Sequence, residues 1–215
     1  MESIKVFISY SSVQKNIGGR FKACLTSYCG YETFIAHSDI PGSLIWEDEI
    51  IKAIESADFF IPLISDAFKV SDFTDQETGI AVSLKKKIIP IKLEDINPYG
   101  FINKYQAMKY KKYQAYDGIR DNIKELVLTI AQIVLNDKQY HEKAINSTVY
   151  AFCNSSSFDT TNATIKIMLN YDHFVSRHLD QIGQAIKRNP QIAGAFGLLA
   201  FREFLHRKYK IAIDS

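Results

Sequence analysis

Four short and mainly apolar segments alternate with helical patterns over the first 93 residues, and this alternation limits the fold most strongly. The apolar segments cover residues 4–9, 31–35, 58–64 and 87–93. Apolar residues at helical 3-and-4 spacing fall between them, at about 14–29, 45–57 and 73–84. Strands of this kind, recurring about every 25 residues with helices between them, are typical of a parallel sheet covered on both faces. We therefore predict an α/β fold. Pro62, which lacks an N–H, suggests that the third strand lies at a sheet edge or contains a bulge.

The second half of the chain changes character. Residues 95–117 are loop-like and rich in tyrosine, and residues 119–135 form an amphipathic helical pattern. After residue 136 the pattern is helical throughout, with candidate helices at about 139–153, 159–170, 173–187 and 190–209. We predict an α/β domain over residues 1–136 and a small all-α domain over residues 137–215.

The composition limits the classes of binding partner and the cellular compartment that we expect for this protein. The net charge is +2 with a pI near 8.3, which argues against nucleic acid or an anionic membrane as the main partner. No apolar run approaches the ~18 residues that span a bilayer, so no membrane segment is predicted. The three cysteines fit a reducing compartment better than a disulfide framework. We expect a cytoplasmic protein.

The sequence lacks the motifs that are typical of several classes of active site. The five histidines have no metal-ligand spacing, so no metal site is predicted. The chain contains neither a Gly-x-Ser-x-Gly elbow nor a phosphate-binding loop, and the Gly18-Gly19 pair is too short for a dinucleotide fingerprint. Nucleophilic hydrolysis and dinucleotide-dependent redox chemistry are therefore poorly supported.

One pair of residues does suggest a ligand-binding site. Glu77 follows Phe73 by four positions, so both side chains lie on one face of the predicted helix. A carboxylate beside a flat aromatic ring suits a ligand that has a planar ring and a sugar. The simpler interpretation is structural, because Asp75 and Glu77 in a first helical turn also oppose the helix dipole.

Six motifs occur in a fixed order along the first 91 residues, and taken together they resemble a known family. They are Val6-Phe-Ile-Ser-Tyr10, Ala36-His-Ser-Asp-Ile-Pro-Gly42, Trp46-Glu-Asp-Glu-Ile50, Ala57 to Ser65, Phe73-Thr-Asp-Gln-Glu77 and Ile88-Ile-Pro-Ile91. This series resembles a TIR domain of the bacterial type, over residues of about 4 to 135.

The resemblance implies a flavodoxin-like sheet and an enzyme that cleaves NAD⁺ at the nicotinamide–ribose bond. Glu77 matches the catalytic glutamate of the family, and Phe73 stands where the family usually has Trp. The other matching positions imply substrate-binding residues, namely Tyr10, Ser11, Asp39 and Trp46. NAD⁺ is the substrate in this comparison, and no cofactor is implied.

The resemblance also implies partners. The loop at Asp39 to Gly42 often completes the site of a neighbouring TIR domain, so a homo-oligomer is expected. The product would be ADP-ribose or a cyclic isomer, which a separate effector could sense in a Thoeris-like antiphage system.

Two other functions remain open at this point. A non-catalytic TIR scaffold or adaptor would act through TIR–TIR contacts, and a nucleoside-processing glycosidase would accept free nucleosides. The helical region could serve self-association or sensing, or could be a structural cap on the TIR domain.

Overall fold

The computed structural model describes residues 2–35 and 46–210. The chain forms two compact units. The sheet unit comprises Lys5–Cys24 and Glu32–Val127. The helical unit comprises Met1–Ile4, Leu25–Tyr31 and Leu128–Ser215. That residues 1–136 and 137–215 are separate domains stays a prediction.

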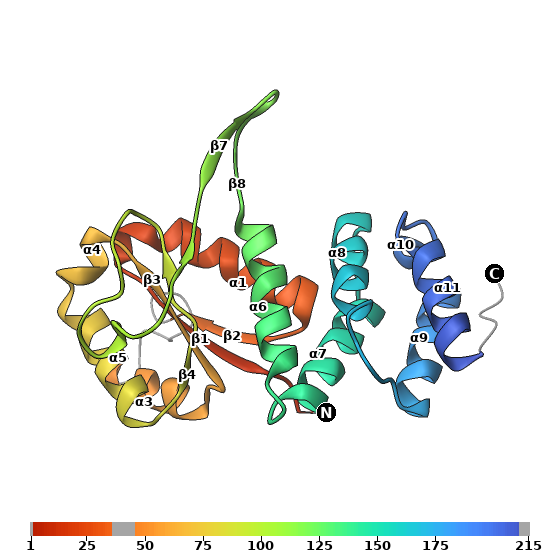
Figure 1. Cartoon of the computed structure of the whole chain (residues 1–215), viewed down its shortest axis with the longest axis horizontal. Helices are drawn as coiled ribbons and strands as arrows, with labels where there is room; N and C mark the ends of the chain where they lie inside the picture. The colour runs from red at the N-terminus through yellow and green to blue at the C-terminus, as the bar shows by residue number, and fades with distance from the viewer. Residues whose placement is uncertain (1, 36–45, 211–215) are drawn as a thin grey trace. The chain divides into compact units, whose positions relative to one another are not determined.

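The sheet unit is built on parallel strands whose order is β2-β1-β3-β5-β6, with β4 also paired to β3 (Figure 1). The strands are β1 (Lys5–Ser9), β2 (Glu32–Ile35), β3 (Phe59–Ile64), β4 (Lys87–Ile88), β5 (Ile91–Lys92) and β6 (Met108–Lys109). With β4 and β5 counted as two pieces of one strand, this is the 2-1-3-4-5 order of flavodoxin-like folds. The predicted α/β fold class is confirmed.

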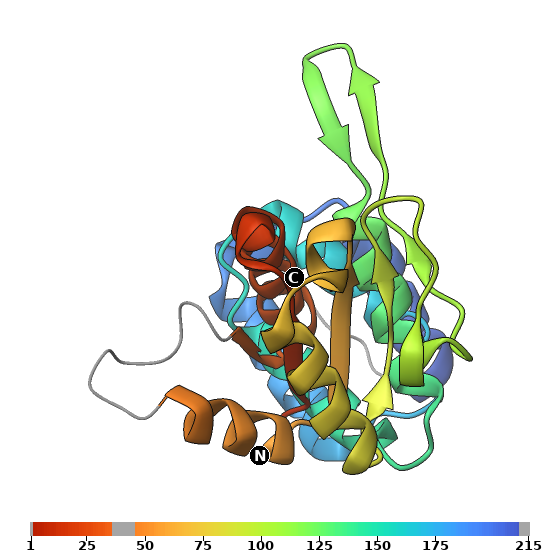
Figure 2. The same cartoon turned by 90° about the vertical axis from the view of Figure 1, so that its left-hand side faces the viewer.

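Helices cover both faces of this sheet. They are α1 (Lys15–Cys29), α3 (Trp46–Ser56), α4 (Asp66–Lys69), α5 (Asp72–Ser83) and the start of α6 (Ile123–Asn136). The chain steps from β1 to β2 in one direction and then to β3 and β4 in the other. Right-handed connections therefore place α1 on one face and α3 with α5 on the other, where Figure 2 shows α3 and α5 side by side. Phe7 and Phe60 stack at 5.7 Å within the core cluster beneath α3 and α5.

The expectation that Pro62 marks an edge strand or a bulge is wrong, because β3 lies in the middle of the sheet. Pro62 stands opposite the gap between β4 and β5, at Ile89 and Pro90. Since Pro62 cannot donate a ladder hydrogen bond, the neighbouring strand is interrupted at that point. The predicted fourth strand is thus two short pieces.

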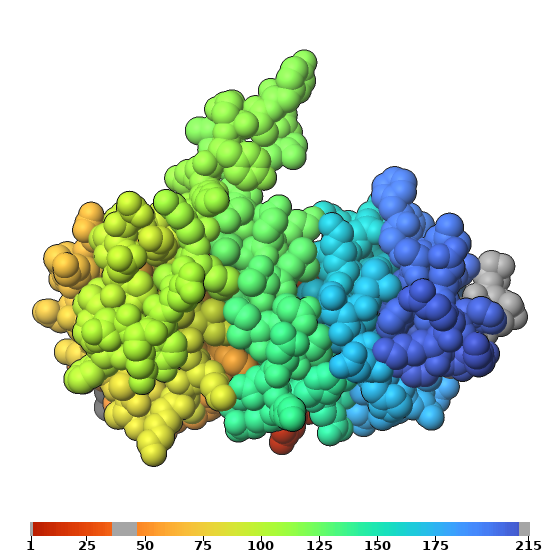
Figure 3. Space-filling model, viewed as in Figure 1, coloured from red at the N-terminus to blue at the C-terminus, as the bar shows by residue number. Residues whose placement is uncertain are grey.

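Residues 112–121 form an antiparallel hairpin, whereas the sequence pattern predicts a loop followed by a helix there. Its strands are β7 (Lys112–Ala115) and β8 (Gly118–Asp121), and it stands clear of the rest of the sheet unit in Figure 3. Most of its residues are exposed, so no buried face imposes an apolar alternation on the sequence. Arg20 of α1 pairs with Asp121 at its base. The described part of the unit also contains two short 3₁₀ turns (Ser12–Gln14 and Gly100–Ile102).

The helical unit contains five helices along residues 141–209. They are α7 (His141–Cys153), α8 (Phe158–Met168), α9 (Ser176–Arg188), α10 (Pro190–Ala193) and α11 (Leu198–Tyr209). α7 packs against α8 and α9. The single helix predicted over 190–209 is two helices, separated by the segment from Gly194 to Gly197.

The end of α1 and the residue Ile4 belong to this unit because both bond to the later helices. Thr164 donates to the Tyr28 carbonyl at 3.1 Å, and Ser147 accepts from the Ile4 N–H at 2.9 Å. Gly30, just after α1, has a φ of +69° and lies so close to α7 that a Cβ would be 2.0 Å from the Ser147 carbonyl oxygen. Only glycine fits this position.

Candidate functional site

Glu77 is a buried carboxylic acid at the centre of the candidate site. It lies in the second turn of α5, is 5% exposed, and accepts a hydrogen bond of 2.5 Å from the Ser9 hydroxyl. Ser9 is the last residue of β1, and it points to the same face as Phe7 because strand side chains alternate. That face is covered by α5, so the end of a central strand and the helix bring the two side chains together.

Burial changes the acidity of this group. Removal from water raises the pKa of Glu77 from 4.5 to about 7, and the hydrogen bond from Ser9 partly opposes that rise. The carboxyl group is therefore close to half ionised at neutral pH. A strongly perturbed carboxyl group next to a specific partner is a common property of functional sites.

The position of Glu77 beside the carboxyl end of β1 also indicates a binding site. Ser9 is the last residue of β1. The chain connects β1 to β2 on one side and then crosses to β3 on the other side, so the direction of the connections reverses between β1 and β3. In open α/β sheets, ligands bind outside the carboxyl ends of the strands at such a reversal. Glu77 thus lies where this fold class places its ligands.

Hydrogen bonds fix the start of α5 against α4, and with it the position of Glu77. Thr74 donates to the carbonyl oxygens of Phe68 at 2.6 Å and Ser71 at 2.9 Å. Ser65, directly after β3, caps α4 by accepting from the Phe68 N–H at 3.0 Å. The polar residues after β3 therefore hold the helix that carries Glu77.

The other predicted site residues are placed differently. Phe73 lies one turn before Glu77 and is 48% exposed, so part of its ring can contact a ligand. Tyr10 is buried, with its ring packed over Gly18 of α1, on the opposite face from Glu77. Ser11 is buried in the turn after β1, where its carbonyl accepts from the Gln14 N–H at 2.7 Å. Their roles in substrate binding stay predictions.

Two of the predicted site residues lie wholly or partly outside the described residues. Asp39 lies outside the described residues, and so does the side chain of Trp46, although Trp46 is the first residue of α3. The substrate-binding roles assigned to them stay predictions as well.

Sequence reasoning missed Ser9 as a partner of Glu77. The available signal was the alternation in β1, where Ser9 is two residues after the buried Phe7. It also missed Tyr99, which donates to Asp75 at 2.9 Å and whose ring lies 5.9 Å from the Lys69 ammonium. Burial and Asp75 raise the pKa of the Tyr99 hydroxyl. No local pattern joins Tyr99 to Asp75, which is 24 positions earlier.

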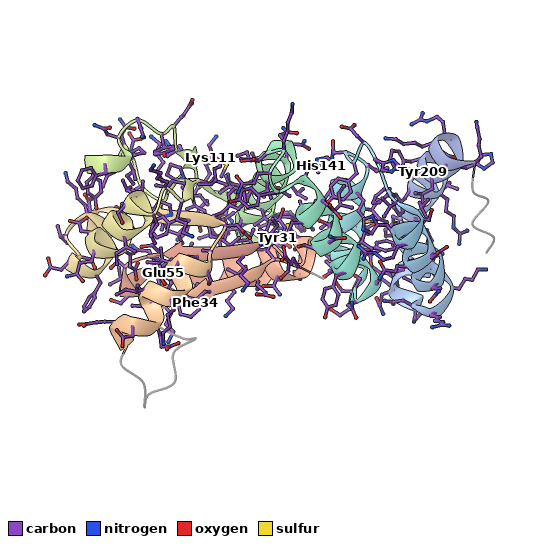
Figure 4. The ribbon with its side chains drawn as sticks, turned by 90° about the horizontal axis from the view of Figure 1, so that it is seen from below. Tyr31, Phe34, Glu55, Lys111, His141 and Tyr209 are labelled. Atoms are coloured by element: carbon purple, nitrogen blue, oxygen red, sulfur yellow. The ribbon has the colours of Figure 1, made fainter. Side chains whose placement is uncertain are left out.

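A groove of about 490 Å³ lies elsewhere in the sheet unit. It is lined by the amino ends of β1 and β2 and by α3, including Glu32, Phe34, Glu49 and Ala53. Figure 4 labels Phe34 on β2 and Glu55 on α3, the two elements that bound it. Glu77 is not among its lining residues, so we place the chemistry at the carboxyl ends of the strands instead. Within residues 2–35 and 46–210, no cluster of His, Cys, Asp and Glu could hold a metal ion.

Residues 6–127, more than half of the chain, match the family model described as the TIR domain. The chain belongs to the TIR domain family. This family includes enzymes that cleave NAD and proteins that act as scaffolds, and its domains generally associate with one another.

Solved structures that match parts of this chain include the TIR domain of the Toll-related receptor TRR-2 from Hydra magnipapillata. It is 21% identical to this TIR protein, with a TM-score of 0.45 over 50% of this chain and 84% of that chain. The CMP N-glycosidase BcmB from Clostridium botulinum is 19% identical, with a TM-score of 0.38 over 58% and 98% of the two chains. A 2-desoxiribosyltransferase from Leishmania mexicana is 17% identical, with a TM-score of 0.35 over 55% and 77%.

No curated protein matches this TIR protein in sequence. Among its described residues, no helix has the length and apolar character needed to cross a membrane. The family assignment thus depends on the match over residues 6–127.

Proposed function

We propose that this TIR protein cleaves NAD⁺ at the nicotinamide–ribose bond, with Glu77 as its catalytic residue. The observation that carries the proposal is the buried Glu77 carboxyl group, bonded to Ser9 at the carboxyl end of β1. The helix position of Glu77, one turn after the half-exposed Phe73, agrees with a ligand that has a sugar next to a planar ring.

The chemistry needs one carboxylate and no metal ion. The bond between C1′ of the ribose and the pyridinium nitrogen breaks, and its electron pair leaves with neutral nicotinamide. Positive charge then develops on the ribose, and the Glu77 carboxylate opposes it, a form of electrostatic stabilisation. Water captures C1′ and loses a proton to give ADP-ribose. A nucleophilic atom of the same molecule would instead give a cyclic isomer.

The acidity of Glu77 suits this role. At a pKa of about 7 the carboxyl group is ready to ionise, and the positively charged nicotinamide ring of NAD⁺ nearby would favour its charged form. The reaction should therefore slow as the pH falls below 7, since protonated Glu77 cannot oppose a developing cation.

The biological part of the proposal comes from the resemblance to bacterial TIR enzymes. The protein would act in the cytoplasm as a homo-oligomer, with NAD⁺ as substrate and with no cofactor. Its product would serve as a signal to a separate effector in antiphage defence of the Thoeris type. Asp39 and Trp46 would contribute to the site with Tyr10 and Ser11.

The alternative is a TIR scaffold that does no chemistry. The hairpin β7–β8 supports it, because Tyr113, Tyr116 and Ile119 are exposed there and offer a contact surface for a protein. A scaffold has no chemical need for the pairing of Glu77 with Ser9, and for that reason we favour the enzyme.

The experiment is to incubate concentrated protein with NAD⁺ or with free nucleosides and to identify the products by mass and retention. We expect nicotinamide with ADP-ribose or its cyclic isomer from NAD⁺, and no free base from nucleosides. Base release from nucleosides alone would indicate a nucleoside glycosidase. Absence of any product, also in the presence of extract from infected cells, would favour the scaffold.

A further inference from the structure

Ser9 and Glu77 form an isolated polar contact inside an apolar part of the sheet unit. Ser9 is 1% exposed and Glu77 is 5% exposed, and the Ser9 hydroxyl lies 2.5 Å from Oε2 of the carboxyl group. The neighbours of Ser9 on this face include Phe7 and Phe60, both fully buried. A buried carboxylate in such surroundings depends strongly on the few hydrogen bonds it receives.

The backbone holds Ser9 rigidly. β1 lies between β2 and β3 in the sheet, and Ser9 is in register with Pro62 of β3. Glu77 is fixed in turn by α5, whose first turn Thr74 ties to α4. The contact therefore joins two rigid elements, which is how precise sites are commonly supported.

The two oxygens of the carboxyl group have different surroundings. Oε2 accepts from Ser9, whereas Oε1 receives no hydrogen bond from any side chain or backbone group in the described part of the chain. Ser9 thus occupies one oxygen and leaves the other available to a ligand.

We propose that Ser9 is a positioning residue for Glu77: its hydroxyl favours the charged form of the carboxyl group and directs Oε1 toward the substrate. The role of Ser9 in the reaction rests on the proposed NAD⁺ cleavage, but its effect on the ionisation of Glu77 does not. Ser9 donates its proton to Oε2. A hydrogen bond to a charged carboxylate oxygen is stronger than one to a neutral carboxyl oxygen, so the contact favours the carboxylate. Without Ser9, burial alone acts on the group, and the pKa of Glu77 rises further.

Another buried serine allows the effect to be separated from a general loss of packing. Ser155 is 4% exposed and belongs to the helical unit, where its hydroxyl bonds the Ser157 carbonyl and the Thr161 hydroxyl. Ser155→Ala removes the same atom from a buried position outside the site, and we expect it to leave the ionisation of Glu77 unchanged.

The test is a pH titration of the Glu77 side chain by NMR in protein labelled with ¹³C-glutamate. Glu77→Gln identifies the signal. In the wild-type protein we expect a midpoint near 7, and in Ser9→Ala a midpoint about one unit higher, because the hydrogen bond to the charged form is lost. Ser9→Thr, which keeps the hydroxyl, and Ser155→Ala should titrate like the wild type.

Kinetics provide the second readout. A rise of one unit leaves about one fifth of the charged form at pH 7, so Ser9→Ala should cleave NAD⁺ about five-fold more slowly there. The difference should disappear near pH 9, and Ser9→Thr should restore the wild-type profile.

The outcomes separate the two proposals. An unchanged Glu77 midpoint in Ser9→Ala would overturn the positioning role, as would a shifted midpoint without a shifted pH–rate profile. If the wild type cleaves no NAD⁺ while the midpoint shifts as expected, the proposed function fails and the control of Glu77 by Ser9 stands. If Ser9→Ala does not fold, Ser9→Cys keeps the volume with a weaker donor, and an unchanged midpoint in that variant would also overturn the proposal.

Discussion

At the scale of single residues, Glu77 should make the folded protein less stable as the pH rises. Its pKa in the folded state, about 7, is above the ordinary value of 4.5. Between these two pH values the folded state binds more protons than the unfolded state, so the free energy of unfolding falls as pH increases. The loss of stability caused by ionisation of the buried Glu77 is complete above about pH 7 and absent below about pH 4.5.

We therefore predict that Glu77→Gln stabilises the protein at pH 8 by about 3 kcal/mol, a rise of roughly 6–12 °C in Tm. At pH 4.5 both side chains are neutral, and the two proteins should melt within about 1–2 °C of each other. Thermal melts across this range provide the measurement. Glu55→Gln, at an exposed position on α3, is the control and should change neither Tm. Equal Tm values for Glu77→Gln and the wild type at pH 8 would show that the Glu77 carboxyl group ionises without cost.

The sequence led to Glu77 and Phe73 because a four-residue spacing within one helix is visible in the sequence itself. The partner of Glu77 was harder to find. Tyr10 and Ser11 were chosen from the same short motif, yet it is Ser9 that faces α5, because the pleat of β1 directs alternate residues to opposite faces. A motif gives the order of residues, and only the register of the strand gives the face.

At the scale of elements, the turn between α1 and β2 admits only glycine. Gly30 has a positive φ, and a Cβ there would be 2.0 Å from the Ser147 carbonyl oxygen. We predict that Gly30→Ala lowers the free energy of unfolding by about 2–4 kcal/mol, since both the backbone strain and the contact with backbone are unfavourable. Urea denaturation should show a lower midpoint.

Gly19 is the matched control for this prediction. It lies inside α1, and apart from its chain neighbours and the backbone of its own helix, no described atom is within 4 Å of the position that its Cβ would take. Gly19→Ala should stabilise the protein by about 0.5–1 kcal/mol, because alanine loses less entropy in a helix. If Gly30→Ala also proved neutral or stabilising, the close approach of this turn to α7 would be contradicted.

The elements that the sequence identified are those with a clear apolar period. β1, β3, α1 and α5 lie within about two residues of their predicted limits. The hairpin β7–β8 was missed because its residues are mostly exposed on both faces. The break between β4 and β5 depends on Pro62 in another strand, and a pattern confined to residues 87–93 cannot contain that information.

At the scale of the whole molecule, the alternation of strands and helices was sufficient to predict the parallel sheet, and the motif series to predict the TIR family. The grouping of residues 25–31 with the helices after residue 128 could not be predicted. It depends on contacts such as Thr164 with Tyr28, which are 136 positions apart. Contacts over such distances leave no periodic mark in either segment.

The most direct test of the central claim is the rate of nicotinamide release from NAD⁺ at pH 7.5, for the wild type beside Glu77→Gln and Glu55→Gln. The proposed role of Glu77 predicts that Glu77→Gln is slower by about 10²–10³-fold, while Glu55→Gln equals the wild type. Rates for Glu77→Gln and the wild type within about two-fold of each other would contradict it.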